Sequence, residues 1–285
     1  LKPYKDRVRA TYENMLISIN YTEKNAKEIQ NLIVESLKDY QPKMKYPIQW
    51  KVDSTKYQMI DFKGFEAGKK TSEVSGQPRL FYDRTKPFTR KVKFYNQYIS
   101  TKEIAIPTYY VIPKSEKKVL DYLKRNNIMV KEMKQDSIIF AQQYKISDFK
   151  TVKNPYEGHY IHYDTQVKAE TKNVNFRKGD FLVSTQQNGV KYLLETLEPE
   201  AADSFFNWNF FDAMLGQKEY YSDYVFEDTA ADLLKNNSVL RTAFEMEKIV
   251  NPDFAKDGKA QLDWVYKYSP YYEGSVGLYP IYRVL

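Results

Sequence analysis

The most constraining feature of this sequence is an aromatic stretch in its second half. Five of the seven residues from 205 to 211 are Phe or Trp. Pro199 suits the first position of a helix, Glu200 and Asp203 suit its N-terminal turn, and Gly216 suits its C-terminal end. Helical spacing then covers both faces with apolar side chains: Ala202, Phe205, Phe206, Phe210, Ala213 and Met214 on one, Trp208, Phe211 and Leu215 on the other. The sequence therefore predicts a helix buried nearly all round, with Phe205, Trp208 and Phe211 in the core.

Helices are expected at both ends of the chain, with strands between them. Residues 4–40 have the pattern of two helices, and Thr22 is the predicted N-cap of the second. The apolar stripe of the first helix is Val8, Tyr12, Met15, Leu16 and Ile19, and that of the second is Ala26, Ile29, Ile33 and Leu37. Strands are expected at 48–52 and 56–62 (as a hairpin), 79–82, 90–99, 103–112, 128–133 and 137–140, with short strands within 144–176. Further helices are expected after Ser115 and at 224–235, 238–250 and 252–267, before an extended tail from 268. The alternation predicts an α+β fold.

Length and composition predict one large or two modest globular domains. Hydrophobic residues make up 42% of the 285 residues and charged residues 28%, which is typical of a folded rather than a disordered chain. The absence of cysteine excludes disulfides, thiolate catalysis and cysteine-ligated zinc, and two histidines limit metal and acid–base chemistry. No apolar run approaches the roughly 18 residues of a membrane span, and Leu1 begins no signal peptide.

Charge is distributed unevenly along the chain. Residues 1–150 contain 30 Lys or Arg against 17 Asp or Glu, a net charge of +13, whereas residues 151–285 contain 14 against 20, a net charge of −6. The lysines of the first half are scattered singly among acidic residues, and no nucleic-acid-binding motif accompanies them. We therefore interpret the charge as a solvated basic surface and predict no nucleic-acid partner.

The two histidines lie close together in the sequence, at positions 159 and 162. A metal site built there would recruit His159, His162 and either Glu157 or Asp164. In a strand, however, residues three apart point to opposite faces, so both imidazoles would reach one ion only at a bend. We favour the alternative in which Glu157 and His159 belong to a turn set by Pro155 and Gly158, and predict no metal site.

Two acidic pairs could be read as catalytic carboxylates. Glu195 and Glu198 are three residues apart, and Glu227 is followed directly by Asp228. Hydrolytic carboxylate pairs are defined by their separation in space, which sequence spacing does not reveal. Acidic side chains near a helix start are more simply partners of the helix dipole, so no catalytic residue is predicted, although a hydrolase using the Glu195 region stays open as a third hypothesis.

The chain contains 26 tyrosines, three adjacent pairs of which invite a binding interpretation. These pairs are Tyr109-Tyr110, Tyr220-Tyr221 and Tyr271-Tyr272. Aromatic faces with polar tips suit carbohydrate or peptide surfaces, but most of the aromatic residues also sit at core-like spacing. A free-standing extracellular glycan- or peptide-binding module is thus one function to consider, with its ligand-binding residues unknown.

Several strings together resemble the region that follows the catalytic domain in large bacterial zinc carboxypeptidase-like proteins. The opening helix Leu-Lys-Pro-Tyr-Lys-Asp-Arg-Val resembles the closing helix of that catalytic domain. Further resemblances, in order, are Ile106–Pro113, Pro155–His159, Gly179–Thr185, Leu194–Pro199 and Trp208–Asp212. The resemblance implies an exported protein, periplasmic or at the cell surface, in which residues 1–45 close an upstream peptidase core and residues 46–285 form an accessory region, subdivided near 113–150.

The same resemblance defines what this chain lacks. Members of the carboxypeptidase A-like metallopeptidase family hold zinc with His-x-x-Glu and a later His, leaving one coordination position for an activated water. No His-x-x-Glu occurs here, so the resemblance implies zinc only for an upstream core and no cofactor in this chain. The first hypothesis is therefore a non-catalytic accessory region that braces or gates the peptidase core, inactive as a hydrolase by itself.

Overall fold

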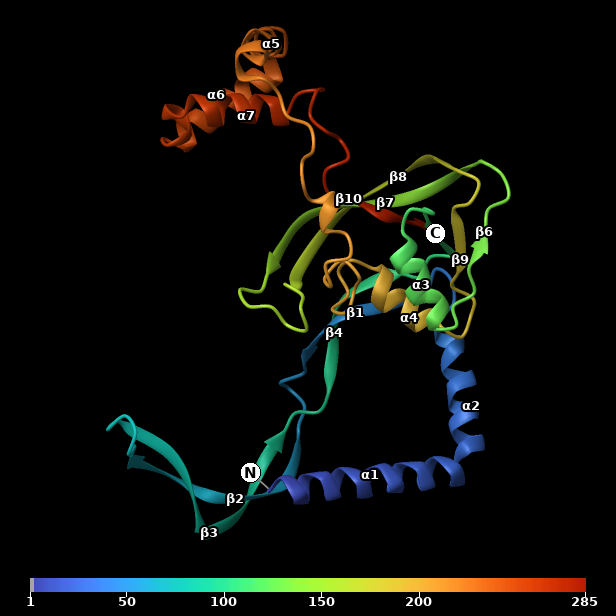
Figure 1. Ribbon diagram of the computed structural model, residues 1–285, viewed down its shortest axis with the longest axis vertical. Helices are drawn as coiled ribbons and strands as arrows, with labels where there is room; N and C mark the ends of the chain where they lie inside the picture. The colour runs from blue at the N-terminus through green and yellow to red at the C-terminus, as the bar shows by residue number, and fades with distance from the viewer. Residues whose placement is uncertain (1–2) are drawn as a thin grey trace. The chain divides into compact units, whose positions relative to one another are not determined.

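Helices lie at both ends of the chain and sheets lie in its middle, which confirms the α+β class (Figure 1). The computed structural model describes residues 3–285. The α-helices are α1 (Tyr4–Lys24), α2 (Ala26–Ser36), α3 (Lys117–Arg125), α4 (Val190–Leu197), α5 (Asp223–Asn236), α6 (Ser238–Val250) and α7 (Gly258–Lys267). The strands are β1 (Lys45–Val52), β2 (Gln58–Thr71), β3 (Pro78–Phe94), β4 (Tyr98–Ala105), β5 (Tyr109–Ile112), β6 (Lys131–Glu132), β7 (Ser137–Thr151), β8 (His162–Phe176), β9 (Phe181–Ser184) and β10 (Leu278–Val284).

The chain divides into two packing units. One contains the chain up to Met44 together with Ile106–Leu285, and the other is Lys45–Ala105. Residues 45–105 therefore pack separately, which the expected accessory region 46–285 did not anticipate. The assignment of residues 1–45 to an upstream core and the subdivision near 113–150 stay predictions.

A six-stranded antiparallel sheet organises the larger unit, in the order β6-β9-β5-β10-β7-β8. β5 and β10 are its central strands, and in β10 every second side chain is buried, at Tyr279, Ile281 and Arg283. β7 and β8 form a long hairpin in place of the short strands expected in 144–176 (Figure 1). The strand expected at 128–133 is reduced to the two residues of β6, and the tail expected to be extended from 268 is a strand only in β10, because most of residues 268–277 form turns.

The predicted aromatic helix is wrong as a helix but right as a buried segment. The helix α4 lies earlier, and residues 199–211 form a chain of turns. Ser204 and Asn207 make these turns: Ser204 Oγ donates to the Pro199 carbonyl and accepts from Asn207 N–H, while Asn207 Nδ2 donates to the Ala201 carbonyl. Such side chain–backbone bonds compete with the helical ladder, and Asn209 adopts φ of +63°, which ends helical propagation. Phe205 and Phe211 are buried as predicted, but Trp208 is half-exposed.

The smaller unit consists of two antiparallel pairs, β1 with β4 and β2 with β3. The expected hairpin between 48–52 and 56–62 is therefore wrong, because the first segment pairs with β4 and the second pairs with β3. The segments expected at 79–82 and 90–99 belong largely to the single strand β3, in which Pro87 lies at a register shift opposite Phe65. A proline is tolerated there because a bulge leaves its missing N–H without a ladder partner. This unit contains 13 Lys or Arg against 6 Asp or Glu, so its net charge of +7 equals that of the whole chain.

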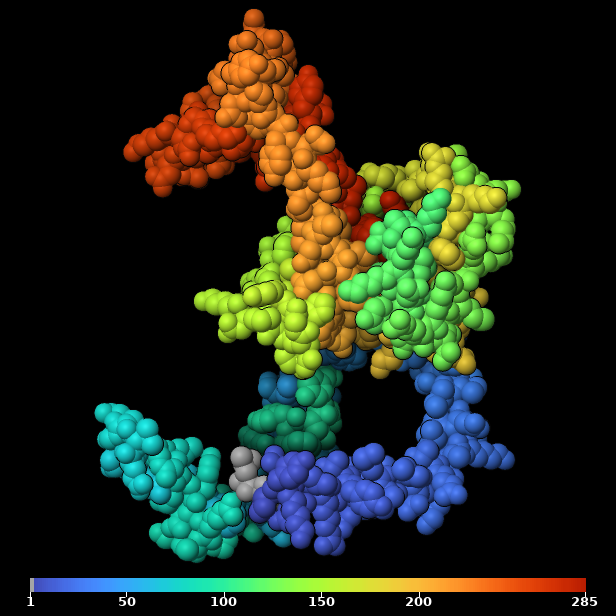
Figure 2. Space-filling view, in the orientation of Figure 1, coloured from blue at the N-terminus to red at the C-terminus, as the bar shows by residue number. Residues whose placement is uncertain are grey.

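The terminal helices agree closely with the sequence pattern. The first two are separated at Asn25 rather than capped at Thr22, whose hydroxyl instead donates to the Ser18 carbonyl within α1. The helices α5–α7 form one cluster, orange to red in Figure 2. Asn237 and Asp257 cap α6 and α7 by accepting backbone N–H groups at 3.0 Å. Among the helices of residues 3–285, none combines the length and apolarity of a bilayer-spanning segment.

Candidate functional site

The two histidines lie in different surroundings. Tyr156 and His159 exchange backbone hydrogen bonds across a turn in which Glu157 and Gly158 both have positive φ, so the expected turn is present. The His159 ring packs edge-on against Trp208, with 5.5 Å between ring centroids. The hydrogen bonds that close this turn are both between backbone groups, of Tyr156 and His159.

His162 is buried and engaged on both ring nitrogens. Its Nδ1 lies 2.9 Å from Thr151 Oγ1, and its Nε2 lies 3.1 Å from Asp212 Oδ1 and 3.2 Å from Asn209 Nδ2. Within the described part of the chain, no group of three or more His, Asp or Glu side chains could hold a metal. The histidine cluster therefore does not fit zinc, and no reaction step through a metal is assigned to it.

The first acidic pair is separated by its surroundings. Glu195 is half-buried on α4, whereas Glu198 lies one residue past that helix, in extended conformation and 1% exposed. Glu198 accepts a hydrogen bond of 2.5 Å from Tyr110 and lies 2.9 Å from Arg283 Nε. Arg283 also donates to Tyr144 and to Gln142. This buried polar network joins α4 to β5, β7 and β10.

The electrostatics of the network are those of a structural site. Burial raises the pKa of the Glu198 carboxyl, although Arg283 and the two tyrosine hydroxyls act in the opposite direction. Burial also raises the pKa of Tyr110 far above its usual value, so this phenol stays protonated. Glu198, Tyr110 and Arg283 are buried and bonded to one another, an arrangement that holds the sheet together.

The predicted tyrosine pairs have different fates. Tyr110 is fully buried in β5, while its neighbour Tyr109 is partly exposed. Tyr220 and Tyr221 precede α5, and Tyr271 follows α7. Tyr220, Tyr221 and Tyr271 come together because the start of α5 lies against the end of α7. The centroid of the Tyr221 ring is 4.8 Å from that of Phe226 and 4.6 Å from that of Tyr266. Tyr271 completes the group, with its ring 6.3 Å from Phe226.

These rings line a cavity of about 420 Å³, here called the tyrosine cavity. Its lining includes five aromatic side chains, Tyr220, Tyr221, Phe226, Tyr266 and Tyr271, and one carboxylate, Glu219. It includes no Lys or Arg. Phe226 and Tyr266 are buried and form its base, whereas Tyr220 and Tyr271 are 75% and 60% exposed at its rim. Apolar walls with a few convergent polar groups are the usual make-up of a small-ligand site.

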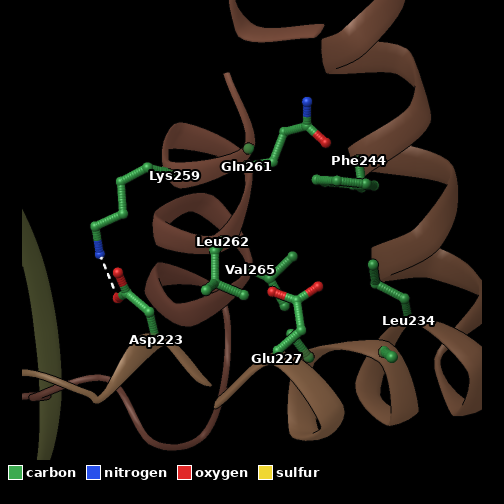
Figure 3. A pocket seen from close by; sticks show the side chains of 11 residues that line it. Asp223, Glu227, Leu234, Phe244, Lys259, Gln261, Leu262 and Val265 are labelled. Atoms are coloured by element: carbon green, nitrogen blue, oxygen red, sulfur yellow. Dashed lines mark hydrogen bonds and ion pairs between the residues drawn. The ribbon is translucent and has the colours of Figure 1, made fainter. Parts of the chain in front are cut away.

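A second cavity, of about 460 Å³, opens among α5, α6 and α7 (Figure 3). Glu227 of the second predicted acidic pair lines it, whereas Asp228 does not. Figure 3 shows the ion pair between Lys259 and Asp223, whose atoms are 2.9 Å apart. Lys259 Nζ also donates to the Tyr221 hydroxyl at 2.9 Å and lies 3.0 Å from Asp263. Hydrogen bonds to Tyr221, Asp223 and Asp263 raise the pKa of Lys259, so the ammonium stays charged.

Lys259 and its partners Tyr221, Asp223 and Asp263 are here called the lysine cluster, which borders both cavities. Lys259 lines the second cavity, and its partner Tyr221 lines the tyrosine cavity. The ammonium lies 4.3 Å from the Tyr221 ring centroid, a cation–π geometry. Sequence reasoning found Tyr220, Tyr221 and Tyr271 but missed Phe226, Tyr266 and Lys259. Phe226 and Tyr266 belong to the core of the helical cluster, and only the fold shows that they also line a cavity.

A different feature concerns the N-terminal helices. Neither α1 nor α2 has a buried residue. The whole apolar stripe predicted for the first helix is exposed, from 42% at Leu16 to 62% at Tyr12. In α2, Ile33 is 55% exposed. An amphipathic helix normally buries its apolar stripe.

Comparison with known proteins adds no family to these observations. No family model matches the chain, and no curated protein and no solved structure is significantly similar to it.

Proposed function

We propose that this chain is the non-catalytic accessory region of a zinc carboxypeptidase-like protein, and that it braces or gates an upstream peptidase core. The observation that carries the proposal is the exposed apolar stripe of α1 and the exposed apolar residues of α2. The ordered resemblance from the opening helix to Trp208–Asp212 supports a peptidase-like core as the covering partner. The parent protein would be an exported bacterial hydrolase.

Physical considerations support a covering partner. Helices in proteins derive most of their stability from packing an apolar face against other parts of the structure. A helix of 21 residues such as α1, with no buried side chain, lacks that contribution within residues 3–285. An upstream domain seated on Val8, Met15 and Ile19 would supply it.

The reading frame that encodes this chain tests the identity of the parent. An upstream extension with His-x-x-Glu and a later His is expected, and a complete reading frame without them would overturn the proposal. A second measurement is hydrolysis of peptides by this chain with added Zn²⁺. No turnover is expected, because no three zinc-ligating side chains converge in the described residues, and turnover abolished by a chelator would contradict the accessory role.

The docking step has its own test in the longer protein. The double substitution Met15→Asp and Ile19→Asp should leave this chain alone as stable as before, because both side chains are exposed. In the longer protein it should expose the α1–α2 region to limited proteolysis. The matched control is Glu13→Gln with Glu23→Gln on the same helix, which should leave the proteolysis pattern unchanged.

A second candidate function is a binding module for an extracellular peptide or glycan. The tyrosine cavity favours it, since exposed rings at the rim of a lined cavity offer a binding surface. This function is compatible with the accessory role, because a region that braces a peptidase can also hold a ligand.

A further inference from the structure

We propose that the tyrosine cavity binds the cationic side chain of a lysine or arginine in a peptide. The inference rests on the second candidate function and names its ligand class. Three observations favour a cation over a neutral sugar: the aromatic lining, the charge of the lining and the charge of the surrounding helices.

The aromatic lining offers ring faces to a ligand. Tyr220 and Tyr271 are exposed at the rim, while Phe226 and Tyr266 form the base. The π faces of aromatic rings carry partial negative charge and attract ammonium and guanidinium groups, and the methylene stem of either side chain packs on apolar surface. The chain already places one cation in this way, since Lys259 lies over the ring of Tyr221.

The charge of the lining is negative. Glu219 is the single charged residue of the lining, and its side chain makes no ion pair with the described residues. Its carboxylate is therefore available to a cationic ligand. Lys218, the residue before it, directs its ammonium toward Glu273 instead, at 3.9 Å.

The surrounding helices are acidic as well. Residues 218–273 contain 11 Asp or Glu against 7 Lys or Arg, a net charge of −4, in a chain whose total is +7. The N-terminus of α5 contributes partial positive charge and the C-terminus of α7 contributes the opposite sign, with Asp223 in the first turn of α5 and Lys267 in the last turn of α7. The local field thus favours a cation.

The cavity volume also fits one side chain with its flanking backbone. At about 420 Å³ it lies at the small end of the range of roughly 300–1,000 Å³ typical of ligand sites. A lysine or arginine side chain would enter between the exposed rings, with its charged end toward Glu219.

Titration of the full chain with capped pentapeptides, followed by saturation-transfer NMR, tests the proposal. The probes are Ala-Ala-Lys-Ala-Ala, its arginine analogue, its norleucine analogue and a neutral methyl pyranoside. The lysine and arginine peptides should bind about fivefold more tightly than the norleucine peptide, the size of a partly exposed cation–π and charge contribution.

Variants locate the binding. Tyr271→Leu and Glu219→Gln should each weaken binding of the lysine peptide by about two- to fivefold. Both side chains are exposed, so the variants should fold, which unchanged thermal unfolding verifies. The matched controls are Tyr224→Leu, exposed on α5 but outside the cavity, and Glu247→Gln on α6; both should bind like the parent chain.

The outcomes separate this inference from the function on which it rests. Equal binding of the lysine and norleucine peptides would overturn the cationic ligand. The cationic ligand would also be overturned if the pyranoside binds and its binding is abolished by Tyr271→Leu but unchanged by Glu219→Gln. The cavity would then remain a binding site, for a neutral glycan. If none of the probes binds, both the inference and the second candidate function fail.

Discussion

Two regions of this protein combine tyrosine, carboxylate and a cationic side chain, yet they differ in what such a combination can do. In the sheet, Glu198 contacts Tyr110 and Arg283, and all three are buried. Among the C-terminal helices, Lys259 contacts Tyr221 and Asp263 beside two open cavities. The residue chemistry is similar, but access to water and to ligands is not.

Burial decides the energetic consequence of each group. A buried ion pair must be complete, because removing one partner leaves a charge without compensation in a medium of low dielectric constant. An exposed pair is screened by water and contributes little to stability. The sheet network therefore acts as a structural element, while the lysine cluster is free to take part in binding without endangering the fold.

The strongest test of this contrast is Arg283→Met. We expect the free energy of unfolding to fall by about 3–5 kcal/mol, because Glu198 would be left buried without its cation. Urea unfolding measures the change. The double variant Glu198→Leu with Arg283→Met should recover part of the loss, since neither charge then remains. A cost below about 1 kcal/mol for Arg283→Met, the size of an exposed pair, would remove the distinction between the two regions.

Leu262→Ala tests whether the helical cluster is energetically separate from the sheet. Leu262 is buried in the core of α5–α7 and borders the second cavity. We expect a cost of about 2 kcal/mol, at the low end for such truncations because the helices can relax into the adjacent space. Hydrogen exchange should accelerate in α5–α7 and stay unchanged in β5 and β10. The matched control is Leu193→Ala on α4, which should produce the reverse pattern.

Local patterns sufficed to predict the helical cluster. The predicted range 238–250 coincides with α6, and α5 extends one residue beyond each end of the predicted range 224–235. The helix α7 ends at 267 as predicted but begins at Gly258 rather than at 252. Their signals are local, as in the Asn237 and Asp257 caps and the apolar spacing at Phe226 and Ala230. Of the tyrosine pairs singled out in the sequence, Tyr220, Tyr221 and Tyr271 line the tyrosine cavity.

The sheet region depends on contacts between distant parts of the chain, which no local pattern contains. No pattern near Arg283 in the sequence indicates its buried partner, since only the fold brings Glu198 to it across 85 positions. The same limit explains the mispaired hairpin at 48–62, because β1 pairs with β4 across the whole β2–β3 ribbon. In the aromatic segment, the helix prediction followed the apolar periodicity and neglected the turn-forming tendency of Ser204 and Asn207. In the structure these two side chains donate to the Pro199 and Ala201 carbonyls, and the segment forms turns.

The dependence of stability on pH offers a finer comparison of the two regions. The pKa of Glu198 is raised above its usual value of 4.5 by burial. Folding therefore favours the protonated form, so the contribution of Glu198 to stability is greatest below pH 4.5 and declines as the pH rises through the raised value. Glu198→Gln should flatten this decline, measured as the free energy of urea unfolding between pH 4 and 8. A steeper decline in the Glu198 variant would reverse the assigned sign.

Lys259→Met should have the smallest effect on stability. Its ion pairs with Asp223 and Asp263 are half-exposed on both sides, so the free energy of unfolding should change by about 0–1 kcal/mol. The hydrogen bond to the Tyr221 hydroxyl disappears at the same time, and with it the cation over that ring. Because the tyrosine cavity then loses a competing positive charge nearby, the lysine pentapeptide should bind somewhat more tightly. Unchanged stability with altered peptide affinity would show that the lysine cluster acts in binding. A loss of unfolding free energy as large as that of Arg283→Met would instead show that it is a second structural network.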